Sequence, residues 1–142
     1  MAEHSDKELN SHEHHKNEIG FSLSPVYFLE EKEFATGLHV HYVRNIQKSK
    51  FGMGVGYERI FDQHKHNTFG IEAIYRPIEK LSFSFSPGLT VEDNNSTANF
   101  ALHFETCYEF EIKELHIGPA FEFAYDIEDY HISLGIHIGY GF

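Results

Sequence analysis

The sequence predicts an all-β chain that folds as an eight-stranded antiparallel up-and-down transmembrane β-barrel. Large apolar residues alternate with small or polar ones in eight successive runs, and a period of two is that of a β-strand. Polar breaks of hairpin length separate the runs, so consecutive strands should lie side by side and antiparallel. The tyrosines fall near the ends of the runs on the apolar face, where membrane barrels carry aromatic residues.

The first four runs follow this alternation in chain order. Their apolar faces carry Ile19, Phe21, Leu23, Pro25 and Tyr27; Phe34, Leu38, Val40 and Tyr42; Phe51, Met53, Val55 and Tyr57; and Phe69, Ile71, Ala73 and Tyr75. The opposite faces carry glycine, serine, histidine and a few charged residues, with Ile74 as an exception in the fourth run. The breaks that we expect after these runs are residues 30–33, 45–49, 62–67 and 77–80.

The last four runs repeat the pattern. Their apolar faces carry Leu81, Phe83, Phe85, Leu89 and Val91; Phe100, Leu102, Phe104, Tyr108 and Phe110; Ile117, Pro119, Phe121, Phe123 and Tyr125; and every even-numbered residue of 130–142. The expected breaks are residues 92–96, 113–114 and 127–129. Eight such strands can close on themselves and leave no exposed edge.

The two faces of the strands differ in a way that predicts which face is inside. A soluble lipocalin-like barrel would turn the apolar face inward and expose a surface with few long charged side chains, which is unusual in water. It would also expose Gly52, Gly54 and Gly56 together, where they only weaken the strand. The interior of an eight-stranded barrel is narrow and filled by side chains, so small residues fit it. We therefore expect the apolar face to contact a lipid bilayer.

Composition limits the other classes of protein. We expect a flexible His-rich tail over residues 1–17 and the barrel over residues 18–142. The formal net charge of −11 argues against a nucleic-acid partner, and the single Cys107 excludes an internal disulfide. No apolar run reaches the roughly 18 residues of a transmembrane helix. The first residues are charged and lack an apolar stretch, so we expect a secretory signal peptide to be absent from this sequence.

The polar face supplies candidate metal ligands. We expect seven of them inside the barrel: His39, His41, Glu72, His103, Glu105, Glu122 and His137. Inward acids, which also include Glu58, Glu109 and Asp126, outnumber the single inward arginine, Arg76, and buried charges must pair, become neutral or bind a cation. Imidazole and carboxylate suit divalent zinc, copper or nickel. The alternative is a hydrogen-bonded and partly hydrated structural network without a metal.

The spacing His-x-His occurs outside the expected strands as well. In the tail it gives a second set of candidate ligands, His12, His14 and His15, which could hold one metal ion or belong to a disordered polar segment. A further copy, His64 and His66, falls in an expected loop.

An enzymatic site is a further alternative. His131 and Ser133 share a face of the last run, and Glu122 or Asp126 of the preceding run could complete a hydrolase triad. We expect these side chains to point inward, away from a lipid ester. Cys107 also points inward and is expected to be a small core residue.

The pattern of residues 18–142 resembles small bacterial outer-membrane barrels of the OmpA and OmpX type. The ending Gly139, Tyr140, Gly141, Phe142 is similar to the terminal aromatic signature that the barrel-assembly machinery recognises. The His-rich segment before the first strand also resembles a Bacteroidota group. The resemblance implies a monomer in the bacterial outer membrane of a Gram-negative cell, with both termini in the periplasm.

That orientation places acidic breaks outside the cell and basic residues at the periplasmic end. The acidic ones are Glu30, Glu31, Glu33, Asp62, Glu92, Asp93, Glu128 and Asp129; the basic ones are Arg44, Lys48, Lys50, Arg76, Lys80 and Lys113. A negative rim attracts cations, although charged loops also serve solubility. The function that we expect is a structural or envelope role with divalent metal bound in the interior or the tail. The alternatives are a narrow cation pathway or metal carrier and, third, a lipid-modifying enzyme.

Overall fold

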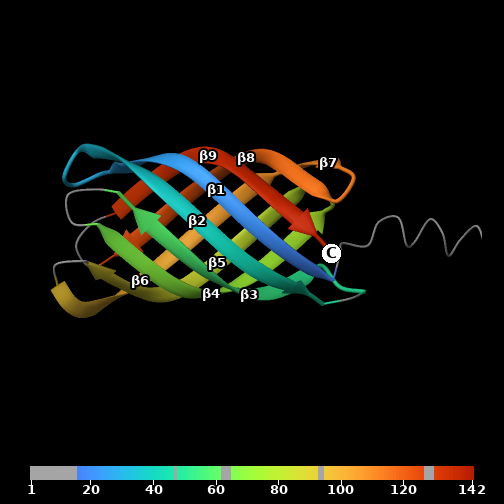
Figure 1. Ribbon diagram of the computed structural model, residues 1–142, viewed down its shortest axis with the longest axis horizontal. Helices are drawn as coiled ribbons and strands as arrows, with labels where there is room; N and C mark the ends of the chain where they lie inside the picture. The colour runs from blue at the N-terminus through green and yellow to red at the C-terminus, as the bar shows by residue number, and fades with distance from the viewer. Residues whose placement is uncertain (1–15, 47, 62–64, 93–94, 127–129) are drawn as a thin grey trace, which may run out of the picture.

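The computed structural model describes residues 16–46, 48–61, 65–92, 95–126 and 130–142 (Figure 1). It contains the strands β1 (Asn17–Phe28), β2 (Glu33–Asn45), β3 (Phe51–Ile60), β4 (His66–Ile78), β5 (Leu81–Glu92), β6 (Asn95–Tyr108), β7 (Phe110–Ile112), β8 (Leu115–Asp126) and β9 (Tyr130–Gly141). β6 and β7 flank Glu109 and pair with β8 in one unbroken register, so together they form one barrel strand. The barrel therefore has eight strands, as predicted.

The sheet closes on itself. With β6 and β7 counted as one strand, each strand pairs antiparallel with its neighbours in sequence, and β1 pairs with β9 to complete the ring. Two backbone hydrogen bonds fasten the closure, from Asn17 N to Phe142 O at 3.0 Å and from Phe142 N to Asn17 O at 2.9 Å. Closure gives hydrogen-bond partners to the backbone N–H and C=O groups of the first and last strands. A membrane requires this because lipid tails offer no hydrogen bonds. Among the described residues, no helix is long and apolar enough to cross a membrane.

The apolar face points outward and the polar face inward. Met53, Ile71 and Leu134 are each 62% exposed, whereas Glu72 is 2% and His137 is 1% exposed. This inversion confirms the prediction made from the alternating pattern. Ile74, the exception in the alternation, lies inside with the polar residues.

Glycine on the inner face makes room for longer polar side chains. A Cβ atom on Gly20 would lie 2.1 Å from His41 Nε2 and 2.6 Å from His137 Cε1. A Cβ atom on Gly56 would lie 2.4 Å from Glu72 Oε1 and 2.9 Å from His39 Nε2. The small residues of the sequence therefore provide the space that the histidines and glutamates occupy.

The two ends of the barrel differ (Figure 1). The end that carries Asn17 and Phe142, called here the terminal end, also carries the β2–β3, β4–β5 and β7–β8 connections. The opposite end, called the far end, carries the β1–β2, β3–β4, β5–β6 and β8–β9 connections. A small apolar cluster of Val26, Phe28 and Ile60 lies at the far end.

One expected position is corrected. The sequence predicts His66 in a loop, but it begins β4, where it lies opposite Ile60 and is buried inside the barrel. Arg76 is buried inside as predicted, in keeping with the alternation of β4. Several of the expected loop and tail positions lie outside the described residues: most of the tail with His12, His14 and His15, and also Asp62, His64, Asp93, Glu128 and Asp129.

Candidate metal centre

Histidine and glutamate dominate the interior of the barrel. Seven histidines belong to the described residues, and all of them lie inside: His39, His41, His66, His103, His116, His131 and His137. Six buried glutamates accompany them: Glu18, Glu58, Glu72, Glu105, Glu109 and Glu122. Among the described residues one arginine, Arg76, is buried, and it pairs with Glu18, its Nη2 lying 3.1 Å from Glu18 Oε2. The other buried glutamates lie next to histidine side chains, so protons on the histidines or bound cations must offset the negative charge of the carboxylates.

Four of these residues converge on one point from different strands. Glu58 comes from β3, His103 from β6, Glu122 from β8 and His131 from β9. β6, β8 and β9 are neighbours in the sheet, whereas β3 lies on another part of the wall, so Glu58 reaches across the interior. We call this set the four-residue site.

Four atoms, one from each residue, define the ion-pair distances of the four-residue site. His103 Nδ1 lies 3.3 Å from Glu122 Oε1 and 3.7 Å from Glu58 Oε1. His131 Nε2 lies 3.5 Å from Glu122 Oε1 and 3.6 Å from Glu58 Oε1. Zinc binds nitrogen and oxygen at about 2.0–2.1 Å, so neighbouring ligands of a tetrahedral ion lie about 3.3–3.4 Å apart. Four of the six edges therefore already have almost the length that a tetrahedral ion requires.

Three of these four atoms lack a hydrogen bond. Glu58 Oε1, Glu122 Oε1 and His131 Nε2 are fully buried and have no hydrogen-bond partner among the described residues. Buried polar atoms are normally satisfied, because leaving one unsatisfied costs roughly 1–3 kcal/mol. A cation at the centre of the four-residue site would satisfy all three at once.

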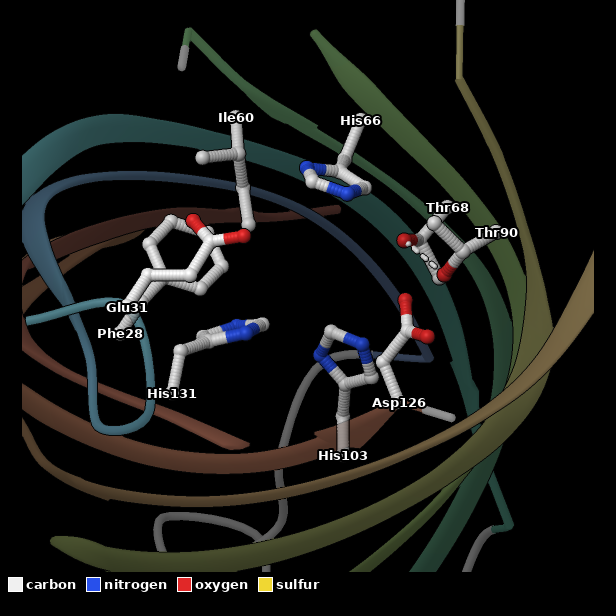
Figure 2. A pocket seen from close by; sticks show the side chains of 9 residues that line it. All are labelled: Phe28, Glu31, Ile60, His66, Thr68, Thr90, His103, Asp126 and His131. Carbon is white, nitrogen blue, oxygen red and sulfur yellow. Dashed lines mark hydrogen bonds between the residues drawn. The ribbon is translucent and has the colours of Figure 1, made fainter. Parts of the chain in front are cut away.

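A small cavity leads to this site from the far end. It has a volume of about 10 Å³ and is lined by Phe28, Glu31, Ile60, His66, Thr68, Thr90, His103, Asp126 and His131. Figure 2 shows the imidazoles of His103 and His131 lining this cavity, with Asp126 beside His103. Thr68 and Thr90 lie side by side on one wall of the cavity, where a hydrogen bond of 2.8 Å joins their hydroxyls. A volume of this size holds about one water molecule.

The predicted interior ligands are all inside the barrel, but they do not form one centre. Only His103 and Glu122 belong to the four-residue site. His39, His41 and Glu72 form a second group, in which His39 Nε2 lies 3.0 Å from Glu72 Oε1 and His41 Nδ1 lies 3.3 Å from Glu72 Oε2. Glu105 and His137 belong to further groups, and His137 Nδ1 shares a hydrogen bond of 2.9 Å with Ser22 Oγ.

Sequence reasoning missed some members of these groups. Glu18 was not placed on the inner face, although Ile19 beside it faces outward and alternation alone would have found it. The alternation predicts Glu58 inside the barrel without indicating that it is a ligand, and it indicates His131 only as a candidate catalytic residue. Their meeting with His103 and Glu122 depends on contacts across the barrel, which no local pattern carries.

The candidate hydrolase residues lie where a membrane lipid cannot reach them. His131, Ser133 and Glu122 are all buried in the interior, as the alternation predicted. Cys107 is also buried, and its thiol donates a hydrogen bond of 3.2 Å to Glu105 Oε1.

Comparisons with known proteins identify the fold. Neisserial surface protein A superposes with a TM-score of 0.65 at 12% identity, over 89% of this chain and 96% of that one. The attachment invasion locus protein Ail of Yersinia pestis gives 0.57 at 14% identity, over 92% and 99%. The N-terminal β-barrel domain of Pseudomonas aeruginosa OprF gives 0.53 at 14% identity, over 90% and 99%.

The chain thus has the fold of small eight-stranded outer-membrane barrels, which confirms the resemblance to that class. No protein-family model matches the chain, and no curated protein matches it. The resemblance to a Bacteroidota group stays a prediction.

Proposed function

We propose that this protein is a small outer-membrane barrel with an envelope role that binds one divalent transition-metal ion, of the zinc class, at the four-residue site. The observation that carries the proposal is the coincidence of two properties in the same atoms. Four of the six distances between the ligand atoms are close to the edges of a zinc tetrahedron, and three of the four atoms have no hydrogen bond among the described residues.

The donor set favours zinc over the other cations that a cell surface meets. Two imidazole nitrogens and two carboxylate oxygens are ligands that zinc accepts in four-coordinate geometry. Magnesium and calcium require six or more oxygen ligands. Copper and nickel bind imidazole well but prefer tetragonal arrangements, so we expect them to bind more weakly here than their general affinity order suggests.

The proposed location is the bacterial outer membrane, with the terminal end in the periplasm and the far end outside. The outward apolar face supports contact with a lipid bilayer. The far end carries Glu30, Glu31 and Glu33 among its described residues, which would favour the approach of cations. We further propose that the protein is a monomer and binds no nucleic acid. We also propose that the barrel-assembly machinery recognises its Phe142.

We also propose that the protein is not an enzyme. The inward direction of His131 and Ser133 supports this, since a lipid acyl ester would have to cross the barrel wall to meet them.

Calorimetric titration of zinc into the detergent-folded protein tests the metal site. We expect one zinc ion per barrel, and a loss of affinity of at least about 100-fold in both Glu58→Gln and His131→Gln. His116→Gln is the matched control, because this buried histidine near the terminal end pairs with Glu109 and lies outside the four-residue site. Heat-modifiable gel migration checks that each variant is folded. The proposal is wrong if folded wild-type protein takes up no zinc, or if the two site variants bind it as well as the control does.

A further inference from the structure

The interior carries more ligand groups than one site needs, and these groups overlap. Among the described residues, five sets of three or four potential ligands have their donor atoms within 4.8 Å of one another. Every set shares at least one residue with another. Glu122 joins the four-residue site to the set of His39, Glu105 and Glu122, and His39 joins that set to the next one.

Glu122 and the residues that share a second set with it, Glu105 and His39, connect the four-residue site to the middle of the barrel. Glu105 and Glu122 are directly opposite each other in the β6–β8 ladder, and both point inward. Two carboxylates at such a position repel each other unless a cation or proton lies between them. His39 Nδ1 lies 3.8 Å from Glu105 Oε2, so a cation that leaves the four-residue site with Glu122 would meet Glu105 and His39 next.

His39 and His41 lie in the middle of the barrel, and the two ring nitrogens of each face different sets of ligands. His39 directs Nδ1 to Glu105 and Nε2 to Glu72. His41 directs Nδ1 to Glu72, at 3.3 Å, and Nε2 to Glu18, at 3.9 Å. His39 Nδ1, His41 Nε2 and both oxygens of Glu72 are buried without a hydrogen-bond partner. Each imidazole can therefore contact an ion on either of its sides.

The last steps reach the terminal end. Glu18 Oε1 lies 3.8 Å from His137 Nε2, and His137 Nε2 lies 3.9 Å from Glu109 Oε1. His116 Nδ1 then lies 3.2 Å from Glu109 Oε2 and 3.7 Å from Glu111 Oε1, and the side chain of Glu111 is 39% exposed. Arg76 holds the other oxygen of Glu18, and its positive charge weakens the binding of a cation there, which favours release at this end.

The cavities exclude a hydrated ion. The cavity above the four-residue site has about 10 Å³, and the one beside His39, Glu72 and Glu105 has about 20 Å³. Each has room for roughly one or two water molecules. Any ion that passes must therefore exchange its water for protein ligands at every step. Conduction of this kind needs several adjacent sites, each strong enough to admit the ion and weak enough to release it.

From this arrangement we infer that the barrel passes dehydrated zinc-class ions from the far end to the terminal end by ligand exchange. The exchange runs between sets that share residues and, at the terminal end, between the neighbouring side chains of Glu109, His116 and Glu111. The inference rests on the proposed metal site, which is its entrance. Four transfer residues each belong to two neighbouring sets and not to the four-residue site: His39, His41, Glu105 and His137. His39 is tested first, because it belongs to the set that follows the four-residue site. Calcium is excluded because the path offers too few oxygen ligands for it.

Vesicles of phosphatidylcholine that contain the folded protein and a trapped zinc-sensitive dye test this path. Zinc added outside should enter vesicles with wild-type protein, and entry should be at least about tenfold slower with His39→Gln. Zinc binding to His39→Gln, measured by calorimetry, should keep the wild-type affinity of the four-residue site. Ser133→Ala, which changes a buried inner-face residue that belongs to none of the five sets and lines neither cavity, should conduct like the wild type. A trapped calcium dye should report no entry.

The outcomes separate the two proposals. Protein that binds zinc but admits none overturns the path and leaves the metal site standing. Protein that neither binds nor admits zinc overturns both. Zinc entry that is unchanged in His39→Gln, or that is accompanied by calcium, shows leakage by another route and also overturns the path.

Discussion

Arg76 on β4 and Glu18 on β1 form an ion pair across the interior of the barrel, with Nη2 and Oε2 3.1 Å apart and both side chains 5% exposed. The two strands are separated in the sheet by β2 and β3, so the pair ties distant parts of the wall together. Arg76 also donates a hydrogen bond to Asn45 on β2. The Arg76 side chain thus connects three strands across the interior and does not only pair with a neighbour in its own hairpin.

Removing Arg76 should destabilise the barrel strongly. Arg76→Ala leaves Glu18 buried near His41 and His137 without its arginine, and breaking a buried pair costs roughly 3–5 kcal/mol. The double variant Glu18→Gln, Arg76→Met should recover most of this loss, because replacing both partners is often nearly neutral. Urea unfolding in lipid vesicles, followed by gel migration, measures both. Equal stability of Arg76→Ala and the wild type would contradict the structural role given to this pair.

Glycine at position 118 should be required for assembly of the wall. A Cβ atom there would lie 1.7 Å from the backbone oxygen of Tyr108, which cannot move without opening the β6–β8 pairing. We expect Gly118→Ala to cost at least about 1–3 kcal/mol of unfolding free energy, as overpacking does. Gly139→Ala is the control, since the nearest atom to its Cβ would be Glu18 Oε1 at 3.0 Å, the end of a flexible side chain. Both variants losing stability equally would show that close approach at Tyr108 is not the cause.

The outward face should reject charge at its middle. Leu134 lies in the middle of β9 and is 62% exposed, so Leu134→Arg places a guanidinium in the hydrocarbon region. We expect a loss of about 2–4 kcal/mol in unfolding free energy measured in vesicles. Tyr130→Arg, at the end of the same strand, should cost only about 0–1 kcal/mol because it can reach the interface. A neutral effect of Leu134→Arg would contradict the placement of this face in lipid.

Cobalt should report the geometry of the four-residue site. Divalent cobalt in place of zinc gives strong visible absorption when it is four-coordinate, and coordination geometry is diagnostic of such sites. We expect this absorption in the wild type, its loss in His103→Gln, and its retention in His66→Gln, because His66 lies outside the site. Weak absorption typical of a six-coordinate ion in the wild type would contradict the tetrahedral arrangement.

Sequence periodicity accounts for a large part of the fold. The alternation in β9, with Ile136 outside and His137 inside, repeats in every strand and sets which side chains enter the barrel. Turn positions follow the polar breaks closely, although the first residues of some strands, such as His66, lie inside breaks expected from composition. Strand ends are less certain from sequence because a polar residue facing the interior resembles one in a loop.

The sequence alone determined the period of the strands, their order and the inversion of polar and apolar faces, because these depend on each residue and its near neighbours. The tertiary structure decided which interior residues meet. Glu58 contacts His103 and His131 only because the tilt and stagger of the closed barrel bring β3 level with β6 and β9 across the interior. A period of two tells which face of the sheet a side chain takes. It does not tell which residues of two non-adjacent strands lie at the same height along the barrel axis. For this reason the candidate ligands could be named from the sequence, whereas their division into overlapping sets could not.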